Sequence, residues 1–200
     1  MGQIRESFFE EKPLSWESLE SLYEYGKAGG TPRTTCKEYY SGNIPFLSIS
    51  DITEQGKYIV KCSQEISAKG LQASSSWIVP KNSLIVSMYA SVGLPTINKI
   101  PLATSQAMFS MIFRDQQLTE YVYQFFLYQR NREIKQKLNT GTQSNINANL
   151  IKSLMIPIYS NPVTCYFLKF ESIMEKAELS CSEELKSLLK LKQSLLSQLL

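Results

Sequence analysis

A run of neutral hydrogen-bonding side chains, TGTQSN, spans residues 140–145 and follows a segment rich in Arg and Lys. Hydroxyl and amide groups can donate to phosphate oxygens without adding charge, and the cationic side chains before them attract the same phosphates. The combination favours contact with a nucleic-acid backbone. The residues expected to make that contact are Arg130, Thr140, Thr142, Gln143, Ser144 and Asn145.

Helix capping is a competing explanation for the same stretch. Gly141 suits the end of the preceding helix, and Asn147 suits the N-cap of a short helix that follows. Capping leaves Thr142, Gln143 and Ser144 without a role, so both explanations can hold together. A structural role that caps the helices on both sides and a contact with a phosphate backbone both stay open at this point.

A second candidate surface lies in SMYASVG, residues 87–93. Ser87, Tyr89 and Ser91 alternate along this segment and would share one face of a strand. Hydroxyls on one face can address phosphates or base edges, although an exposed strand face without a role is the commoner explanation. Lysines in or near turns could add phosphate contacts, or could simply be solvated. The lysines predicted to bind DNA are Lys57, Lys69 and Lys99.

Several kinds of catalytic chemistry have no residues to support them. The chain has 200 residues, a formal net charge of +3 and no histidine, which removes His-based catalysis and His-ligated zinc. There is no phosphate-cradling GxxxxGK[ST] or GxGxxG motif, and we recognise no paired carboxylates suited to acid–base work. We therefore expect a non-catalytic protein without cofactor or metal.

The cysteine pattern and the N-terminus bear on the compartment. The four cysteines form no CxxC pair, which favours free thiols in a reducing compartment. The N-terminal MGQIRESFFEEK has no apolar core, so it does not look like a secretory signal. These features predict a soluble cytoplasmic protein.

The elements that must position these residues fall into an α+β pattern, with a β-rich middle between helices. Apolar spacing predicts helices over residues 14–25 and 117–138. Residues 65–74, EISAKGLQAS, could form one helical turn or a loop. Short segments rich in β-branched and aromatic residues predict strands, namely IPFLSIS, KYIVKC, WIVP, SLIVSMY, PTINKI and MFSMIF.

The last segment, residues 163–200, contains no Pro or Gly and predicts one long helix resembling a coiled-coil strand. Such a helix is about 50 Å long, which exceeds a small domain, so it must project and have its apolar stripe covered. We predict one domain over residues 1–160 and this spacer or dimerisation helix after it. The stripe comprises Phe170, Met174, Ala177, Cys181, Leu185, Leu188, Leu195 and Leu199.

The order of several short motifs resembles one half of the specificity subunit of type I restriction–modification systems. Each motif is weak alone, but the ordered set, from about residue 14 to residue 200, is specific. The set is Trp16 with a following Leu, GGTP, YYSGNIPFLSISDI, ISAKGLQASS, IVPKNSLIVSMYASVG, TGTQSNI and IKSLMIPI.

The resemblance implies a β-rich target recognition domain with flanking helices, which reads half of a bipartite DNA sequence in the major groove. It implies a long helix that fixes the distance between two half-sites, and it places methylation and cleavage in partner methyltransferase and restriction subunits. A complete subunit shows the motif set twice, whereas Trp16, GGTP and TGTQ each occur once here. The chain also lacks the Glu-Gln pair that the family usually carries after IPI.

A single motif set indicates a half-length form with one recognition domain, either natural or a piece of a longer chain. Two copies paired antiparallel through the last helix would imitate the complete subunit, so we expect a homodimer. An alternative function is a helical scaffold whose β-rich part binds a peptide or another protein. The modest net charge favours this alternative slightly.

Overall fold

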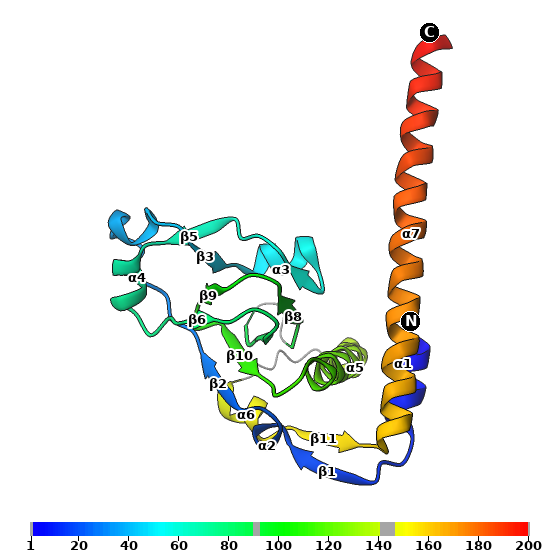
Figure 1. The fold of residues 1–200 in the computed structure, drawn as a ribbon, viewed down its shortest axis with the longest axis horizontal. Coiled ribbons are helices and arrows are strands. Elements are labelled where there is room, and N and C mark those ends of the chain that lie inside the picture. Colours follow the sequence, from blue (N-terminus) through cyan, green and yellow to red (C-terminus); the bar gives the residue numbers. More distant parts are fainter. Residues whose placement is uncertain (1, 90–92, 141–146, 200) are drawn as a thin grey trace.

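The structure is a computed structural model that describes residues 2–89, 93–140 and 147–199. Within these residues the side chains of 133–140 and 193–199, and several between 178 and 189, lie outside the description. The described part forms a β-rich body, a helix that crosses beside it, and one long helix that runs on past the body (Figure 1).

A five-stranded sheet is the centre of the body. Its order is β2-β10-β7-β8-β4, in which only the last pair, β8 with β4, is parallel among these strands. Strands β7 and β8 are buried on both faces, which is why their sequences read as nearly continuous apolar runs. The strands are β2 (Tyr25–Ala28), β4 (Tyr58–Ile59), β7 (Leu84–Ser87), β8 (Pro95–Asn98) and β10 (Met108–Ile112).

A four-stranded sheet packs beside it in the order β5-β3-β9-β6. Pro45 is the second residue of β3, and this position near a strand start agrees with the expectation from sequence. The strands are β3 (Ile44–Leu47), β5 (Gln64–Ile66), β6 (Ile78–Val79) and β9 (Leu102–Thr104). The mixture of sheets and helices confirms the predicted α+β class, although a coiled coil of the C-terminal helix stays a prediction.

Strand β3 ends earlier than the IPFLSIS pattern predicts. The Ser48 side chain accepts from Asp51 N–H at 3.2 Å, and the Asp51 carboxylate accepts from Ser48 N–H at 3.0 Å. This capping box starts α3 (Ile49–Gln55) at the residue after Ser48. The ambiguous stretch 65–74 holds both a strand end and a helix, α4 (Ala68–Gln72), which Ser67 caps.

The helix predicted over residues 14–25 is wrong. Residues Ser15–Ser18 form β1, which pairs antiparallel with β11 (Met155–Ile158), and only α2 (Leu19–Leu22) is helical. Leu19 is fully buried whereas Trp16 is 53 % exposed, so the apolar residues do not share a helical face. Pairing with a strand some 140 positions later overrides the local spacing, because it satisfies backbone hydrogen bonds that a short isolated helix cannot keep.

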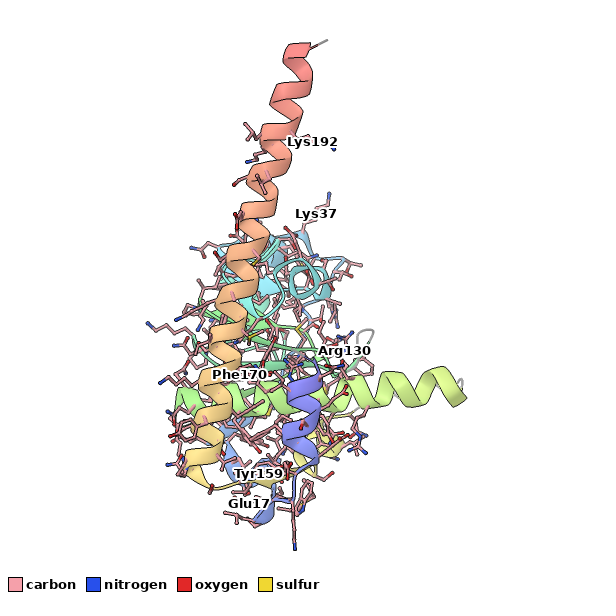
Figure 2. All side chains as sticks on the ribbon, turned by 90° about the vertical axis from the view of Figure 1, so that its right-hand side faces the viewer. Glu17, Lys37, Arg130, Tyr159, Phe170 and Lys192 are labelled. Atoms are coloured by element: carbon pink, nitrogen blue, oxygen red, sulfur yellow. The ribbon has the colours of Figure 1, made fainter. Side chains whose placement is uncertain are left out.

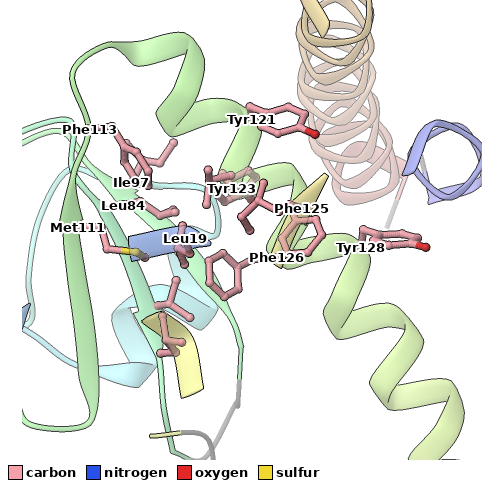
Figure 3. Close-up of a cluster of buried hydrophobic side chains, with 14 of the residues drawn as sticks. Leu19, Leu84, Ile97, Met111, Phe113, Tyr121, Tyr123, Phe125, Phe126 and Tyr128 are labelled. Carbon is pink, nitrogen blue, oxygen red and sulfur yellow. The ribbon is translucent and has the colours of Figure 1, made fainter. Parts of the chain in front are cut away.

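Helix α5 (Gln116–Thr140) carries the main hydrophobic core and confirms the helix predicted over 117–138. Its first half packs buried aromatic side chains onto the five-stranded sheet, as Figure 3 shows. Its second half leaves the body (Figure 2). The core residues from the helix are Tyr121, Val122, Tyr123, Phe125, Phe126 and Tyr128, and they meet Leu84, Ile97 and Met111 of the sheet.

Helix α7 (Asn161–Leu199) is the long helix expected from the sequence and is about 58 Å long at 1.5 Å per residue. Its base packs against α5 and against the N-terminal helix α1 (Gly2–Glu10), and the rest extends beyond the body (Figures 1 and 2). Two short helical segments complete the fold, η1 (Lys37–Tyr40) and α6 (Ala148–Lys152). Asn147 caps α6 through Leu150 N–H at 2.8 Å, as predicted.

Candidate nucleic-acid interface

Two segments far apart in sequence, 29–40 and 67–78, lie against each other on the β-rich body. Ser67 N–H donates to Tyr39 O at 2.9 Å, and the Ser67 hydroxyl donates to Glu38 O at 2.7 Å. Glycines allow this approach, because a Cβ on Gly30 would lie 2.3 Å from the Ser75 hydroxyl oxygen. A Cβ on Gly29 would lie 2.0 Å from the backbone oxygen of Thr104. The two glycines therefore allow the GGTP loop, residues 29–32, to pack directly against β9 and the segment 67–78.

The surface of these two segments is cationic. Arg33 and Lys37 are exposed, and neither was selected from the sequence. Lys69 of α4, which was selected, is 75 % exposed at its side chain and pairs with Glu38 at 3.2 Å. An exposed pair of this kind is worth at most about 1 kcal/mol, so Lys69 can exchange Glu38 for a phosphate. Their position in the sequence just after the GGTP turn is the signal that could have identified Arg33 and Lys37 as candidate contacts.

Aromatic side chains border this cationic surface. Tyr25 on the edge strand β2 is 49 % exposed and lies edge-on to Trp77, with ring centroids 5.2 Å apart. Lys27 is exposed on the same strand. We call Lys27, Arg33, Lys37 and Lys69, with their aromatic border, the tip surface. Cationic groups beside exposed aromatic rings can bind phosphates and stack on bases or sugars.

Lys57 must be removed from the predicted DNA contacts. Its Nζ lies 2.7 Å from Glu120 of α5 and 2.5 Å from Glu175 of α7, and its side chain is 13 % exposed. Burial by itself would lower the pKa of Lys57, but the two carboxylates outweigh burial and raise it. Lys57 therefore stays charged and is neutralised inside the protein, where no phosphate can replace both partners.

Ser87 is also unavailable to a ligand. The residue is fully buried at the end of β7, and its hydroxyl donates to Tyr89 O at 2.6 Å. Tyr89 is 44 % exposed, so the two do not share an open strand face. The alternation argument failed because both faces of β7 are covered. Ser91, the third residue of this set, lies outside the described residues.

Two further predicted DNA contacts, Lys99 and Arg130, are described by the structure and are not part of the tip surface. Lys99 Nζ lies 3.2 Å from Asn82 Oδ1 and sits 4.4 Å from the centroid of the Tyr58 ring. Arg130 is half-buried on α5, a helix that lies well away from α4 (Figure 1). Thr140 is the last residue of α5, and its side chain lies outside the description. Thr142, Gln143, Ser144 and Asn145 also lie outside the described residues.

The apolar stripe of α7 is broader than predicted. Phe170 is 39 % exposed and Leu188 is 56 % exposed, and Ala177 and Cys181 are exposed with them, whereas Met174 is half-buried. The side chains of Leu185, Leu195 and Leu199 lie outside the description. The sequence analysis missed further exposed apolar residues on this helix, namely Val163, Tyr166 and Ile173. Leu191, whose place in the stripe the spacing leaves open between it and Lys192, is 56 % exposed.

The described residues also bear on metal sites and membrane spans. No group of three His, Cys, Asp or Glu side chains in this part of the chain is placed to hold a metal ion. Among the helices described here, none combines the length and the apolar character that crossing a membrane requires.

Burial raises the pKa of the Cys62 thiol to about 12, helped by the nearby carboxylates of Asp51 and Glu65. A thiol in this state is a poor nucleophile.

Two curated proteins are similar to this chain in sequence. The specificity subunit of the type I restriction enzyme HindI from Haemophilus influenzae is 32 % identical over 194 residues, covering 94 % of this chain and 41 % of that protein. The MjaIX specificity subunit from Methanocaldococcus jannaschii is 27 % identical over 164 residues, covering 80 % and 38 % respectively. The chain thus spans about two fifths of the length of these relatives.

Solved structures with the same fold include two subunits of this kind. The HsdS subunit from Thermoanaerobacter tengcongensis superposes with a TM-score of 0.68 at 12 % identity, covering 90 % of this chain and 43 % of that one. The S subunit of a type I restriction–modification system from M. genitalium gives 0.60 at 12 % identity, covering 96 % and 50 %. At such low identity these likenesses concern the fold alone.

The family to which the chain matches is described as the type I restriction modification DNA specificity domain, and the match spans residues 13–160. That range includes the five-stranded sheet, the four-stranded sheet, the β1–β11 pair, α5 and the tip surface, and it ends where α7 begins. The chain therefore belongs to the family of type I restriction–modification DNA specificity domains.

Proposed function

We propose that this chain is the DNA-recognition part of a type I restriction–modification enzyme and reads one half of a bipartite target. The family match over residues 13–160 is the observation that carries the proposal. The chain itself would be non-catalytic. Methyltransferase and restriction subunits would dock on it and supply the chemistry.

The tip surface is the part of the body best suited to hold DNA. Arg33, Lys37 and Lys69 would neutralise phosphates, and this term dominates affinity without selecting sequence. Lys99, Arg130, Tyr89 and the stretch 140–145 stay in the proposal as further contacts. Bases would be read by side chains of neighbouring loops at about 1–3 kcal/mol for each good bidentate contact.

The projecting part of α7 supports a proposed pairing with a second copy. Exposed apolar residues continue along the helix from Phe170 to Leu191, and a stripe of this kind needs a partner. Antiparallel pairing would give a twofold dimer with one recognition domain at each end. Such a dimer would read two identical, inverted half-sites. The division into residues 1–160 and 163–200 stays a prediction.

The decisive experiment is co-expression with a type I methyltransferase subunit in a host that lacks other adenine methylation, followed by sequencing that maps methylated adenines. We expect a symmetric bipartite motif that disappears when this chain is omitted. A complex that forms but methylates adenines without sequence preference would overturn the recognition role.

A helical scaffold that binds a peptide or another protein is the alternative function. Duplex DNA of mixed sequence separates the two, because a protein that neutralises several phosphates loses affinity steeply between about 50 and 200 mM salt. We expect that steep loss. Binding that is absent at low salt would favour the scaffold.

A further inference from the structure

Lys57 is fixed to the five-stranded sheet through its own backbone. Its carbonyl oxygen accepts from Ile97 N–H at 2.8 Å and from the Thr96 hydroxyl at 3.1 Å, and both of these β8 residues are buried. Its ammonium lies 4.9 Å from the centroid of the Tyr58 ring and 5.4 Å from that of the Tyr123 ring. Contacts of this kind hold a cation over an aromatic face. The charge of Lys57 therefore has a set position relative to the sheet.

Two polar contacts tie α7 to the rest of the chain, and they lie one helical turn apart. Lys57 Nζ lies 2.5 Å from Glu175 and 2.7 Å from Glu120 of α5, whereas Arg5 Nη2 lies 3.3 Å from Glu171. Glu171 and Glu175 are about 6 Å apart along the helix. One contact would let the helix pivot, but two contacts at different heights define its direction. The Arg5 contact is the weaker, because Glu171 Oε1 is buried without a hydrogen-bond partner among the described residues.

The apolar contacts of α7 with the main core lie closer to the start of the helix. Phe167 is buried in that core and Leu168 packs against it. Further along, Phe170 is 39 % exposed and Ile173 is 56 % exposed. Apolar packing therefore holds the base of α7. The contact between Lys57 and Glu175 lies where the helix starts to leave the body.

The length of α7 amplifies any change of direction at this point. Beyond Glu175 the helix runs on past the body to Leu199, which is about 36 Å at 1.5 Å per residue (Figure 1). A tilt of about 10° at Glu175 would move that end by about 6 Å, which approaches two base-pair steps of about 3.4 Å each. A small angular error would therefore change the spacing by whole base pairs.

From these observations we infer that Lys57 sets the direction of α7 relative to the recognition body and thereby selects how many base pairs are accepted between two half-sites. This rests on the proposed function, because it concerns the spacing of the bipartite target. Lys57 touches no DNA in this role and acts only through α7, so it is a positioning residue. The two carboxylates that keep it from phosphates are the groups through which it acts.

The distance between two spin labels in one copy measures the direction of α7. The four native cysteines are replaced by serine, and labels are attached at Glu54→Cys of α3 and Lys190→Cys of α7, both exposed positions. Dilution with unlabelled protein restricts the signal to pairs within one copy. We expect one narrow distance while Lys57 is present. A tilt of about 10° moves residue 190 by about 4 Å, so Lys57→Met should shift or broaden the distance by a similar amount.

A charge-swapped variant separates positioning from a general loss of stability. Lys57→Glu with Glu175→Lys again places one cation among two carboxylates, because the side chain at position 175 can then meet both Glu120 and position 57. We expect the narrow distance to return in this variant. Glu175→Gln is a milder change, which leaves the Lys57–Glu120 pair and should broaden the distance less. Lys61→Met is the matched control, because Lys61 is exposed, and it should leave the distance unchanged.

The methylation experiment measures the spacing separately from the half-site sequences. The unchanged chain should methylate a motif with one spacer length. Lys57→Met should keep the same half-sites but spread methylation over two or more spacer lengths. The charge-swapped variant and Lys61→Met should each keep a single length. A residue that contributed only to stability would lower the number of methylated sites without changing their spacing.

An unchanged label distance in Lys57→Met would overturn the inference. A broadened distance with an unchanged spacer length would overturn it as well, because the direction of α7 would then not select the spacing. The proposed function fails separately. If the unchanged chain directs no bipartite methylation, that function and the spacing both fall, and the label distances still decide whether Lys57 positions α7.

Discussion

Lys57 and Glu175 stand 118 positions apart in the chain, yet their Nζ and Oε2 atoms lie 2.5 Å apart. Lys57 also meets Glu120 of α5. A second tie, from Arg5 to Glu171 and to Gln124, lies one helical turn away on both α7 and α5. These two rungs fix where the long helix leaves the recognition body. If the long helix sets the distance between two half-sites, as proposed above, that attachment must be rigid.

Lys57→Met should lower the free energy of unfolding by about 1.5–3 kcal/mol, the range for a hydrogen bond to a charged group. The substitution leaves the Glu120 and Glu175 carboxylates close together without a cation between them. Urea unfolding at neutral pH measures the effect. Lys69→Met is the control, because the exposed Lys69–Glu38 pair should contribute no more than about 1 kcal/mol. Equal losses in both variants would show that the Lys57 network is not structural.

Asp51→Asn should destabilise the protein at neutral pH by about 1–3 kcal/mol, because the carboxylate accepts from Ser48 and from Ser63 N–H. Burial opposes ionisation, but these hydrogen bonds prevail and hold the pKa of Asp51 below its usual value of 3.8. Because the pKa of Asp51 is lowered in the folded state, the stabilisation that its carboxylate contributes is complete above about pH 4. This stabilisation is lost as the pH falls through the lowered pKa.

The difference in unfolding free energy between Asp51→Asn and the unchanged protein should therefore shrink toward zero in acid. Denaturant unfolding at a series of pH values measures it. Glu54→Gln, an exposed change on the same helix, should stay within about 0.5 kcal/mol. A difference for Asp51→Asn that stays constant throughout the acid range would contradict the assignment.

Arg33→Ala with Lys37→Ala should weaken binding to duplex DNA of every sequence. Each lost phosphate contact should reduce the slope of log affinity against log salt by about 1. Fluorescence anisotropy over a salt series measures both quantities. Lys12→Ala removes an exposed charge beside β1, away from the tip surface, and should change neither quantity. A slope that is unaffected by the double substitution would rule out the tip surface as the phosphate contact.

Gln143→Ala with Ser144→Ala should also weaken binding to all DNA alike, because this stretch is expected to touch the backbone rather than bases. Competition between duplexes that differ at single base pairs measures the preference. Any altered ranking among those duplexes would reassign the stretch to base reading. The two residues lie outside the described part of the chain, so this expectation rests on sequence alone.

The elements that local chemistry controls were predictable. Helix α7 follows from 39 residues with regular apolar spacing and with proline only at its second position, and α5 follows from its aromatic repeat. The Asn147 cap could be predicted because the residue bonds a backbone group three positions away. The same locality explains why β3, β7, β8 and β10 were found from short runs of β-branched and aromatic residues.

The failures arose where partners lie far away in sequence. Residues 14–25 read as a helix, but β11 converts their first part into a strand. Ser87 read as an open strand face, but other elements of the body cover both faces of β7. Arg33 and Lys37 could be recognised as part of a cationic surface only in the structure, where the segment 67–78, which carries Lys69, packs against their loop.

By itself the sequence determined the α+β class and the long terminal helix, because composition and local periodicity carry that information. The ordered set of short motifs carried the resemblance to the family. Only the tertiary structure decided which charges are free. In the sequence, a lysine in a turn looks the same whether its side chain will face water or two carboxylates. Lys57 is buried against glutamates of α5 and α7, which come much later in the chain, whereas Lys69 stays exposed. Burial and pairing are properties of the assembled fold, so they could not be read from spacing along the chain.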